Sequence, residues 1–249
     1  MTMSGFAPDW PAPAGVRAWV TERPGGVSAN AYAALNLATH VGDDPDSVAA
    51  NRKLLRVGLN LPGEPVWLEQ VHGTTVLDLD SAPVRAAADG TVTSRSGVVC
   101  AVLTADCLPV ILSDRLGRRI GVAHAGWRGL LHGVLPAAIR ALAVAPRDVL
   151  AWLGPAIGPQ AYEVGPEVRA AFADHGSALA DCFTANSRGR WQADLYALAR
   201  CSLEGAGVTA IYGGGFCTFD DSHRFFSHRR EAPCGRMATL IWKGSDSYA

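Results

Sequence analysis

Residues 105–124, ADCLPVILSDRLGRRIGVAH, decide the fold. Two apolar runs, Leu108–Leu112 and Ile120–Ala123, flank the polar residues 113–118, a pattern typical of two antiparallel strands joined by a tight turn. If the turn is centred between Arg115 and Leu116, Cys107 lies opposite His124 on the same face, with Cβ atoms roughly 4.5 to 5.5 Å apart. The pattern therefore predicts a thiol and an imidazole in contact at the open end of a hairpin.

Such a Cys107–His124 pair fits two kinds of chemistry. The two side chains can share a metal ion, or the imidazole can act as the base that activates the thiol as a nucleophile. A one-residue bulge would turn the two side chains to opposite faces, so the prediction depends on the register of the hairpin.

Composition limits the class of protein. The chain has 249 residues and a formal net charge of −1, which gives no reason to expect a nucleic-acid or membrane partner. No apolar run approaches the ~20 residues of a membrane span, and the first 16 residues do not resemble a secretory signal. Six scattered cysteines without a Cys-x-x-Cys pair are typical of reduced thiols, so we expect a cytoplasmic protein.

Hydrophobic periodicity predicts the elements around the hairpin. A helix is expected to follow His124 directly and to run to about Val144. The other expected strands are Val16–Thr21, Gly97–Leu103, Val149–Leu153 and Thr239–Trp242, and the other expected helices are Val48–Val57 with Asp46 or Ser47 as N-cap, Val168–His175 and Leu195–Ala206. Residues 213–218 are expected to form a strand in which the backbone approaches a neighbour closely.

Isolated polar residues are candidates for binding. Asn36 lies inside an apolar stretch, so its amide needs partners, either local backbone or a ligand. Arg128, in the first turn after His124, can bind an anion together with the start of the helix, or the glycines beside it can simply allow close packing. Arg229, Arg230 and Arg236 each fit an anion site or a solvated edge. Asp106 is expected on the opposite strand face from Cys107, in a structural role.

Three blocks of sequence carry a family resemblance. LEQVHG (68–73), TADCLPV (104–110) and VAHAGWRG (122–129) resemble the signature blocks of the zinc-dependent purine nucleoside phosphorylase family, which is also called the laccase-domain, polyphenol oxidase or peptidoglycan-editing-factor family. Blocks near residues 25–28, 35–37, 154–158 and 226–236 are similar to it as well. The chain differs from the family pattern at His228, where tyrosine is common, and at Cys234, where a small hydroxyl residue is expected.

The resemblance implies a metal site and a fold. His72, Cys107 and His124 would be the ligands of a catalytic Zn²⁺ with an open fourth position, and the same donors also accept copper. The implied fold is a single α/β domain over residues 1–249. It is a β-sandwich flanked by helices, in α/β/β/α layers, related to cysteine hydrolases of the deamidating-toxin kind.

The resemblance also implies the chemistry and the partners, a nucleoside and phosphate. Adenosine, inosine, guanosine and methylthioadenosine would be cleaved by phosphate to the base and a ribose 1-phosphate, and adenosine would be deaminated to inosine. In this scheme Arg128 or Arg229 holds phosphate and Asn36 contacts the sugar or the base.

Three other functions stay open. Without a metal, Cys107 and His124 would form an amide hydrolase acting in peptidoglycan editing. With copper, the chain would be a polyphenol oxidase (laccase), although three ligands do not build the several copper centres that four-electron oxygen reduction uses. The third alternative is a regulatory binding module without catalysis.

Overall fold

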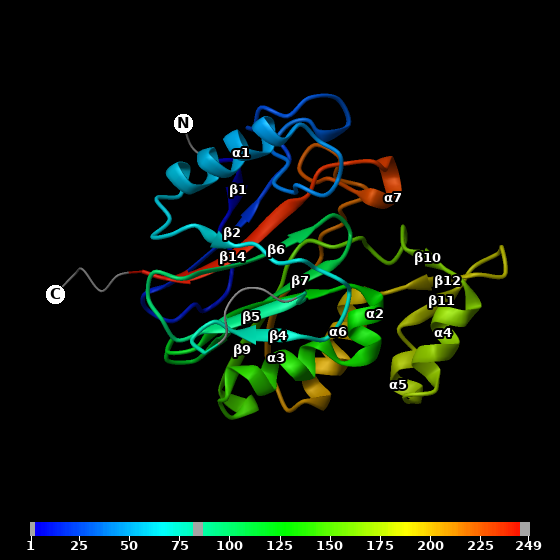
Figure 1. Cartoon of the computed structure of the whole chain (residues 1–249). Coiled ribbons are helices and arrows are strands. Elements are labelled where there is room, and N and C mark those ends of the chain that lie inside the picture. The colour runs from blue at the N-terminus through cyan, green and yellow to red at the C-terminus, as the bar shows by residue number, and fades with distance from the viewer. Residues whose placement is uncertain (1–2, 82–86, 245–249) are drawn as a thin grey trace.

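A computed structural model describes residues 3–81 and 87–244 of the chain (Figure 1). The strands are β1 (Gly5–Phe6), β2 (Val16–Thr21), β3 (Pro65–Val66), β4 (Val76–Asp78), β5 (Gly90–Thr93), β6 (Val99–Thr104), β7 (Leu108–Asp114), β8 (Ile120–Ala125), β9 (Val149–Leu153), β10 (Glu163–Val164), β11 (Phe183–Ala185), β12 (Trp191–Ala193), β13 (Ala210–Gly213) and β14 (Met237–Lys243). The α-helices are α1 (Pro45–Gly58), α2 (Trp127–His132), α3 (Val134–Leu142), α4 (Pro166–Ala173), α5 (Ser177–Ala180), α6 (Leu195–Gly205) and α7 (His228–Glu231). Across these described ranges, no helix has both the length and the apolar character needed to cross a membrane.

The strands form two large sheets and one small sheet. The first has the order β1-β2-β14-β6-β3, so the last strand of the chain lies between β2 and β6 and pairs antiparallel with both. The second has the order β13-β9-β7-β8-β5-β4. A separate sheet of β10, β12 and β11 lies with α4 and α5 at one end of the molecule (Figure 1).

Apolar side chains from both large sheets share one core. Val102 and Ile241 of the first sheet pack in the same buried cluster as Ile111, Val122 and Trp152 of the second. On the outer side of the first sheet, α1 contributes Leu55 to another cluster, and α3 and α6 cover the second sheet (Figure 1). The predicted mixed α/β class is therefore confirmed.

Most predicted strands and helices exist. β2 and β9 have the predicted bounds. The ends of β6 and β14 each lie within two residues of the predicted ends. Helices α4 and α6 also match to within about a turn. Residues 213–218 are not a strand beyond Gly213, because Gly213, Gly214 and Gly215 all have positive φ (73°, 90° and 82°).

The register of the hairpin was predicted wrongly by two residues. Pro109 pairs with His124, and Ser113 pairs with Ile120. The loop contains four residues, 115–118, because the Asp114 N–H donates to the Arg119 carbonyl at 2.9 Å. A shift of two residues keeps each side chain on its face of the sheet, so the predicted proximity of thiol and imidazole survives the error.

Two helix predictions also need correction. The segment after His124 forms two helices, α2 and α3, because Gly133 between them has φ +90°, which ends the first helix. Helix α1 starts earlier than predicted, at Pro45, and its N-cap is Asp44, whose carboxylate accepts the Ser47 N–H at 3.0 Å.

Candidate metal centre

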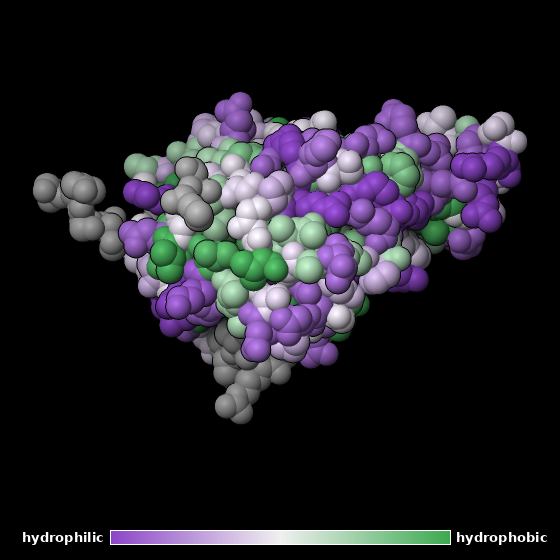
Figure 2. All heavy atoms as spheres, turned by 90° about the horizontal axis from the view of Figure 1, so that it is seen from above, coloured by the Kyte–Doolittle hydropathy of each residue, from purple (hydrophilic) through white to green (hydrophobic). Residues whose placement is uncertain are grey.

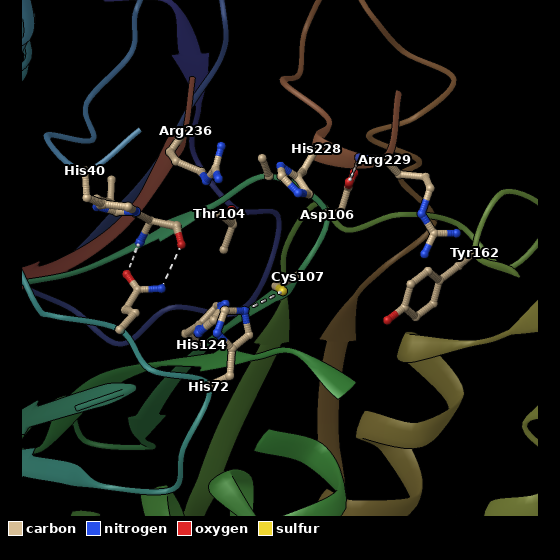
Figure 3. Close-up of a pocket in the computed structure, with 13 residues that line it drawn as sticks. His40, His72, Thr104, Asp106, Cys107, His124, Tyr162, His228, Arg229 and Arg236 are labelled. Carbon is tan, nitrogen blue, oxygen red and sulfur yellow. Dashed lines mark hydrogen bonds between the residues drawn. The ribbon is translucent and has the colours of Figure 1, made fainter. Parts of the chain in front are cut away.

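His72, Cys107 and His124 converge where the two large sheets are connected. His72 lies in the coil between β3 and β4, Cys107 in the bend that carries the chain from β6 to β7, and His124 in β8. Their ligand atoms all lie within 4.8 Å of one another, and Cys107 Sγ is 3.8 Å from His72 Nε2. The structure thus brings together all three side chains that the sequence singled out (Figure 3).

Asp89 holds both histidines. Its fully buried carboxylate lies 2.8 Å from His124 Nδ1 and accepts the backbone N–H groups of His72 at 2.9 Å and Gly73 at 2.6 Å. This contact orients the His124 ring so that Nε2 is left to face Cys107. Asp89 was not among the predicted site residues, because an Asp-Gly pair before a strand is typical of a turn.

The three side chains perturb one another electrostatically. Burial alone would raise the pKa of the Cys107 thiol. The charges and hydrogen bonds of His124 and His72 outweigh burial and lower this pKa to about 6. Burial works to lower the pKa of His124, but Cys107 and Asp89 raise it to about 9. Each group therefore favours the charged form of the other, the thiolate of Cys107 and the imidazolium of His124.

The donors fit a transition-metal ion. Zinc sites in proteins use thiolate and imidazole ligands, and three protein donors leave a fourth position for water or substrate. The same donors suit copper. Among the residues that the structure describes, no fourth His, Cys, Asp or Glu joins this cluster.

A cavity of about 300 Å³ opens above the cluster. Histidines, arginines, Asp106 and Tyr162 supply most of its polar lining (Figure 3). The lining residues are His40, Gln70, His72, Leu103, Thr104, Ala105, Asp106, Cys107, His124, Tyr162, His228, Arg229 and Arg236. In the view of Figure 2, hydrophilic residues predominate on the side where α7 and the small sheet lie in Figure 1. A polar ligand suits such a cavity better than an apolar one.

Asp106 was expected on the opposite strand face from Cys107, but it lies before β7 and lines the same cavity as Cys107; its carboxylate nevertheless contacts only protein groups. It adopts φ +94° in the bend before β7, and its two carboxylate oxygens accept the Thr218 hydroxyl at 2.6 Å and the Arg229 N–H at 2.7 Å. Both oxygens are thus engaged by protein groups, and the second contact fixes the start of α7 at the rim of the cavity.

Of the three other predicted binding residues, Arg229, Arg128 and Asn36, only Arg229 lines the cavity. Arg229 lines the cavity, with its guanidinium 5.1 Å from the Tyr162 ring centroid and donating to the Glu163 carbonyl at 2.8 Å. Arg128 is exposed, stacks on Trp127 at 4.4 Å and is not among the lining residues.

Asn36 is not brought to the cavity. It is fully buried, and its Oδ1 accepts the N–H groups of Ala38 and Arg236, both at 3.0 Å. The expected direct contact with sugar or base is therefore wrong for this structure. Asn36 instead positions the backbone of Arg236, which does line the cavity.

Sequence reasoning missed several lining residues. His40 and Tyr162 carry no motif that distinguishes them from surface residues, and Gln70 is held by the backbone of Leu103 through bonds of 2.8 and 2.7 Å. Arg236 was predicted either to bind an anion or to lie on a solvated edge, and the structure places it in the lining of the cavity.

Fold and site together define a class, a mixed α/β protein with three potential metal ligands at the junction of two sheets. The chain belongs to the family described as multi-copper polyphenol oxidoreductase laccase, whose profile matches residues 17–244. This confirms the family expected from the signature blocks.

Relatives with assigned names are similar over most of their length. A purine nucleoside phosphorylase of Pseudomonas aeruginosa is 52% identical, with 95% of this chain and 97% of the relative covered. The purine nucleoside phosphorylase YfiH of Escherichia coli is 49% identical, with 95% and 98% covered.

Solved structures share the fold. Protein NMB0706 of Neisseria meningitidis superposes with a TM-score of 0.91 at 46% identity, covering 97% of this chain and all of that one. YlmD of Geobacillus stearothermophilus superposes with a TM-score of 0.87 at 32% identity, covering 94% of each chain.

Proposed function

We propose that this protein is an enzyme, a zinc-dependent purine nucleoside phosphorylase. The observation that carries the proposal is the cluster of His72, Cys107 and His124 at the base of a cavity rimmed by cationic side chains. Relatives with 41% to 52% identity that are named purine nucleoside phosphorylases support it.

The proposed substrates are adenosine, inosine, guanosine and methylthioadenosine. An oxygen of inorganic phosphate forms a bond to the anomeric carbon, the bond from that carbon to the purine nitrogen breaks, and the products are the free base and ribose 1-phosphate or its 5-methylthio analogue. We also propose that the same site deaminates adenosine, with water attacking the purine ring and ammonia leaving.

The residues of the chain divide this work. His72, Cys107 and His124 would hold a zinc ion, which would supply Lewis acidity at the base of the cavity. Asp89 keeps His124 in the orientation that leaves Nε2 free, and Arg229 adds positive charge to the wall of the cavity. Burial raises the pKa of Tyr162, so its hydroxyl stays protonated and can donate a hydrogen bond to the substrate.

We further propose the finer architecture expected from the family, a β-sandwich in α/β/β/α layers like that of cysteine hydrolases. The core shared by the two large sheets supports the layering. We also keep the proposal of a cytoplasmic enzyme with small-molecule partners, supported by six free cysteines.

The test is phosphate-dependent release of hypoxanthine from inosine by purified, zinc-loaded protein. We expect activity that disappears with a chelator and returns with zinc, and a Cys107→Ser variant that stays inactive. Adenosine in phosphate-free buffer tests the deaminase activity. Absence of base release from all four nucleosides would overturn the proposal.

One observation favours a second candidate, a metal-free amide hydrolase. The lowered pKa of Cys107 and its partnership with His124 are also what a thiol nucleophile needs. Metal analysis of protein purified without added metal separates the two, since about one zinc per chain is expected for the phosphorylase and none for the hydrolase. Within the described residues one His/Cys cluster exists, which disfavours a multi-copper oxidase.

A further inference from the structure

The geometry points to a subsite for inorganic phosphate formed by Arg236 and His40, on the side of the cavity away from Tyr162 and Arg229. This inference rests on the proposed function and assigns its second substrate a place. Figure 3 shows Arg236 and His40 together on one side, Tyr162 and Arg229 on the other, and Cys107 between the two pairs.

Arg236 is a cation without a carboxylate partner among the described residues. Its Nη1 donates to the carbonyls of Cys234 at 2.8 Å and Gly235 at 3.0 Å, which leaves the other guanidinium nitrogens for a ligand. Two other arginines differ from it in having a carboxylate partner: Arg23 pairs with Glu231 at 2.8 Å, and Arg230 pairs with the same glutamate at 2.9 Å. The positive charge of Arg236 is therefore available to the cavity.

The backbone that carries Arg236 is fixed. Asn36 Oδ1 accepts the Arg236 N–H at 3.0 Å, and Asn36 is itself fully buried. A Cβ on the preceding Gly235 would lie 2.6 Å from the Phe226 ring and 2.9 Å from Asn36 Cβ, so the turn admits only glycine. Arg236 is thus held in place before a ligand arrives, which reduces the entropic cost of binding.

The surroundings favour an anion. Asp106 is the only carboxylate among the described lining residues, and both of its oxygens already accept hydrogen bonds. Burial lowers the pKa of His40, and the charges of Arg236 and Arg52 lower it further, which indicates positive potential on this side. A guanidinium binds phosphate through two parallel N–H groups, and the His40 imidazole offers a third donor.

The other side of the cavity suits the nucleoside. Arg229 lies over the Tyr162 ring and is held by the Glu163 carbonyl, which forms a flat aromatic and cationic surface of the kind on which a purine stacks. Phosphate at Arg236 would then meet the ribose from the side opposite the departing base.

The test compares arginine variants by calorimetric titration of zinc-loaded protein with inorganic phosphate, and by the phosphate KM of inosine cleavage. We expect Arg236→Gln to weaken phosphate binding and raise the phosphate KM by roughly tenfold or more, with the inosine KM changed less. Arg236→Lys should give a phosphate dissociation constant and a phosphate KM between those of the wild type and Arg236→Gln, because lysine keeps the charge and loses the paired N–H groups. His40→Asn should show a smaller effect in the same direction.

Arg140→Gln, an exposed charge removal on α3, is the matched control and should leave both phosphate constants unchanged. Arg128→Gln and Arg229→Gln test the two other placements. Circular dichroism and thermal melts establish that each variant is folded. The inference would be overturned if folded Arg236→Gln kept the wild-type phosphate dissociation constant while Arg128→Gln or Arg229→Gln lost phosphate binding.

The two proposals fail separately. If the wild type cleaves inosine and Arg236→Gln keeps its phosphate KM, the subsite is wrong and the phosphorylase stands. If the wild type binds phosphate through Arg236 but releases no base, the subsite stands and the phosphorylase is wrong.

Discussion

The Asp89 side chain contacts two of the three candidate metal ligands. Its carboxylate accepts from the imidazole of one candidate ligand and from the backbone of another, so a single residue holds His124 and the His72 loop together. A carboxylate behind a metal-bound histidine raises the basicity of the imidazole and fixes its tautomer.

We predict that Asp89→Asn lowers zinc affinity by roughly 10–100-fold, because the amide NH₂ would replace one acceptor oxygen with a donor facing N–H groups. Competition with a chromophoric chelator measures the affinity. Asp46→Asn, an exposed change in the first turn of α1, is the control. Equal affinities for the two variants would refute the role of Asp89.

Asp80 provides a pH-dependent contribution to stability. Burial works to raise its pKa, but hydrogen bonds from Ser94 and Thr93 and the charge of Arg119 hold it at about 2, below the ordinary value of 3.8. The stabilisation is therefore present above about pH 4 and is lost as the pH falls towards 2.

We predict that the difference in unfolding free energy between wild type and Asp80→Asn is larger at pH 7 than at pH 2.5. Urea titrations at both pH values measure it, with Asp9→Asn, an exposed substitution, as the control. A difference that is the same at both pH values would contradict the assignment.

The sequence motifs predicted the three candidate metal ligands, but they did not predict that Asp89 holds two of them. His72, Cys107 and His124 stand in recognisable motifs. Asp89 meets His124 across the pairing of β5 with β8 and meets the His72 loop 16 to 18 residues back along the chain. Such contacts depend on how strands far apart in sequence are ordered, which local patterns do not encode.

Elements were predictable where one periodicity dominated. β2 and β9 are short apolar segments with clear borders, and their bounds match the prediction. The turn of the hairpin was placed one residue too early in the prediction, because the apolar pattern alone does not fix which residues of the polar stretch 113–118 form the loop. The break at Gly133 was missed because the apolar periodicity of α2 continues into α3.

We predict that Gly133→Ala destabilises the protein by about 1–2 kcal/mol, since alanine disfavours φ +90°. A Cβ there meets nothing within 4 Å, so the cost is conformational. Gly205→Ala, at the end of α6 with equally open space, should be neutral or stabilising by up to ~1 kcal/mol. Chemical denaturation compares the two variants, and equal destabilisation would contradict the explanation.

For the whole molecule, the candidate metal centre joins segments that belong to different sheets. Cys107 lies on the connection between them and His124 lies in β8, so an ion bound there links both halves of the core. Binding to the folded state alone stabilises a protein in proportion to the logarithm of ligand concentration over its dissociation constant.

We predict that zinc at ~100 times its dissociation constant adds about 2.7 kcal/mol, which raises the melting temperature by roughly 5–10 °C. Thermal melts of chelator-treated protein with and without added zinc provide the measurement. Cys107→Ser should show little of this shift. A wild-type melting temperature that ignores zinc would contradict the proposed centre.

The position of β14 in the centre of its sheet has a consequence for biosynthesis. The ribosome delivers residues 237–243 after every other described strand, and until they emerge β2 and β6 have no partner between them. Arg236 and the turn that holds it arrive at the same moment. Partial translation products therefore expose two unpaired strand edges and contain no finished cavity, so premature termination late in the message yields inactive polypeptide that is a substrate for degradation.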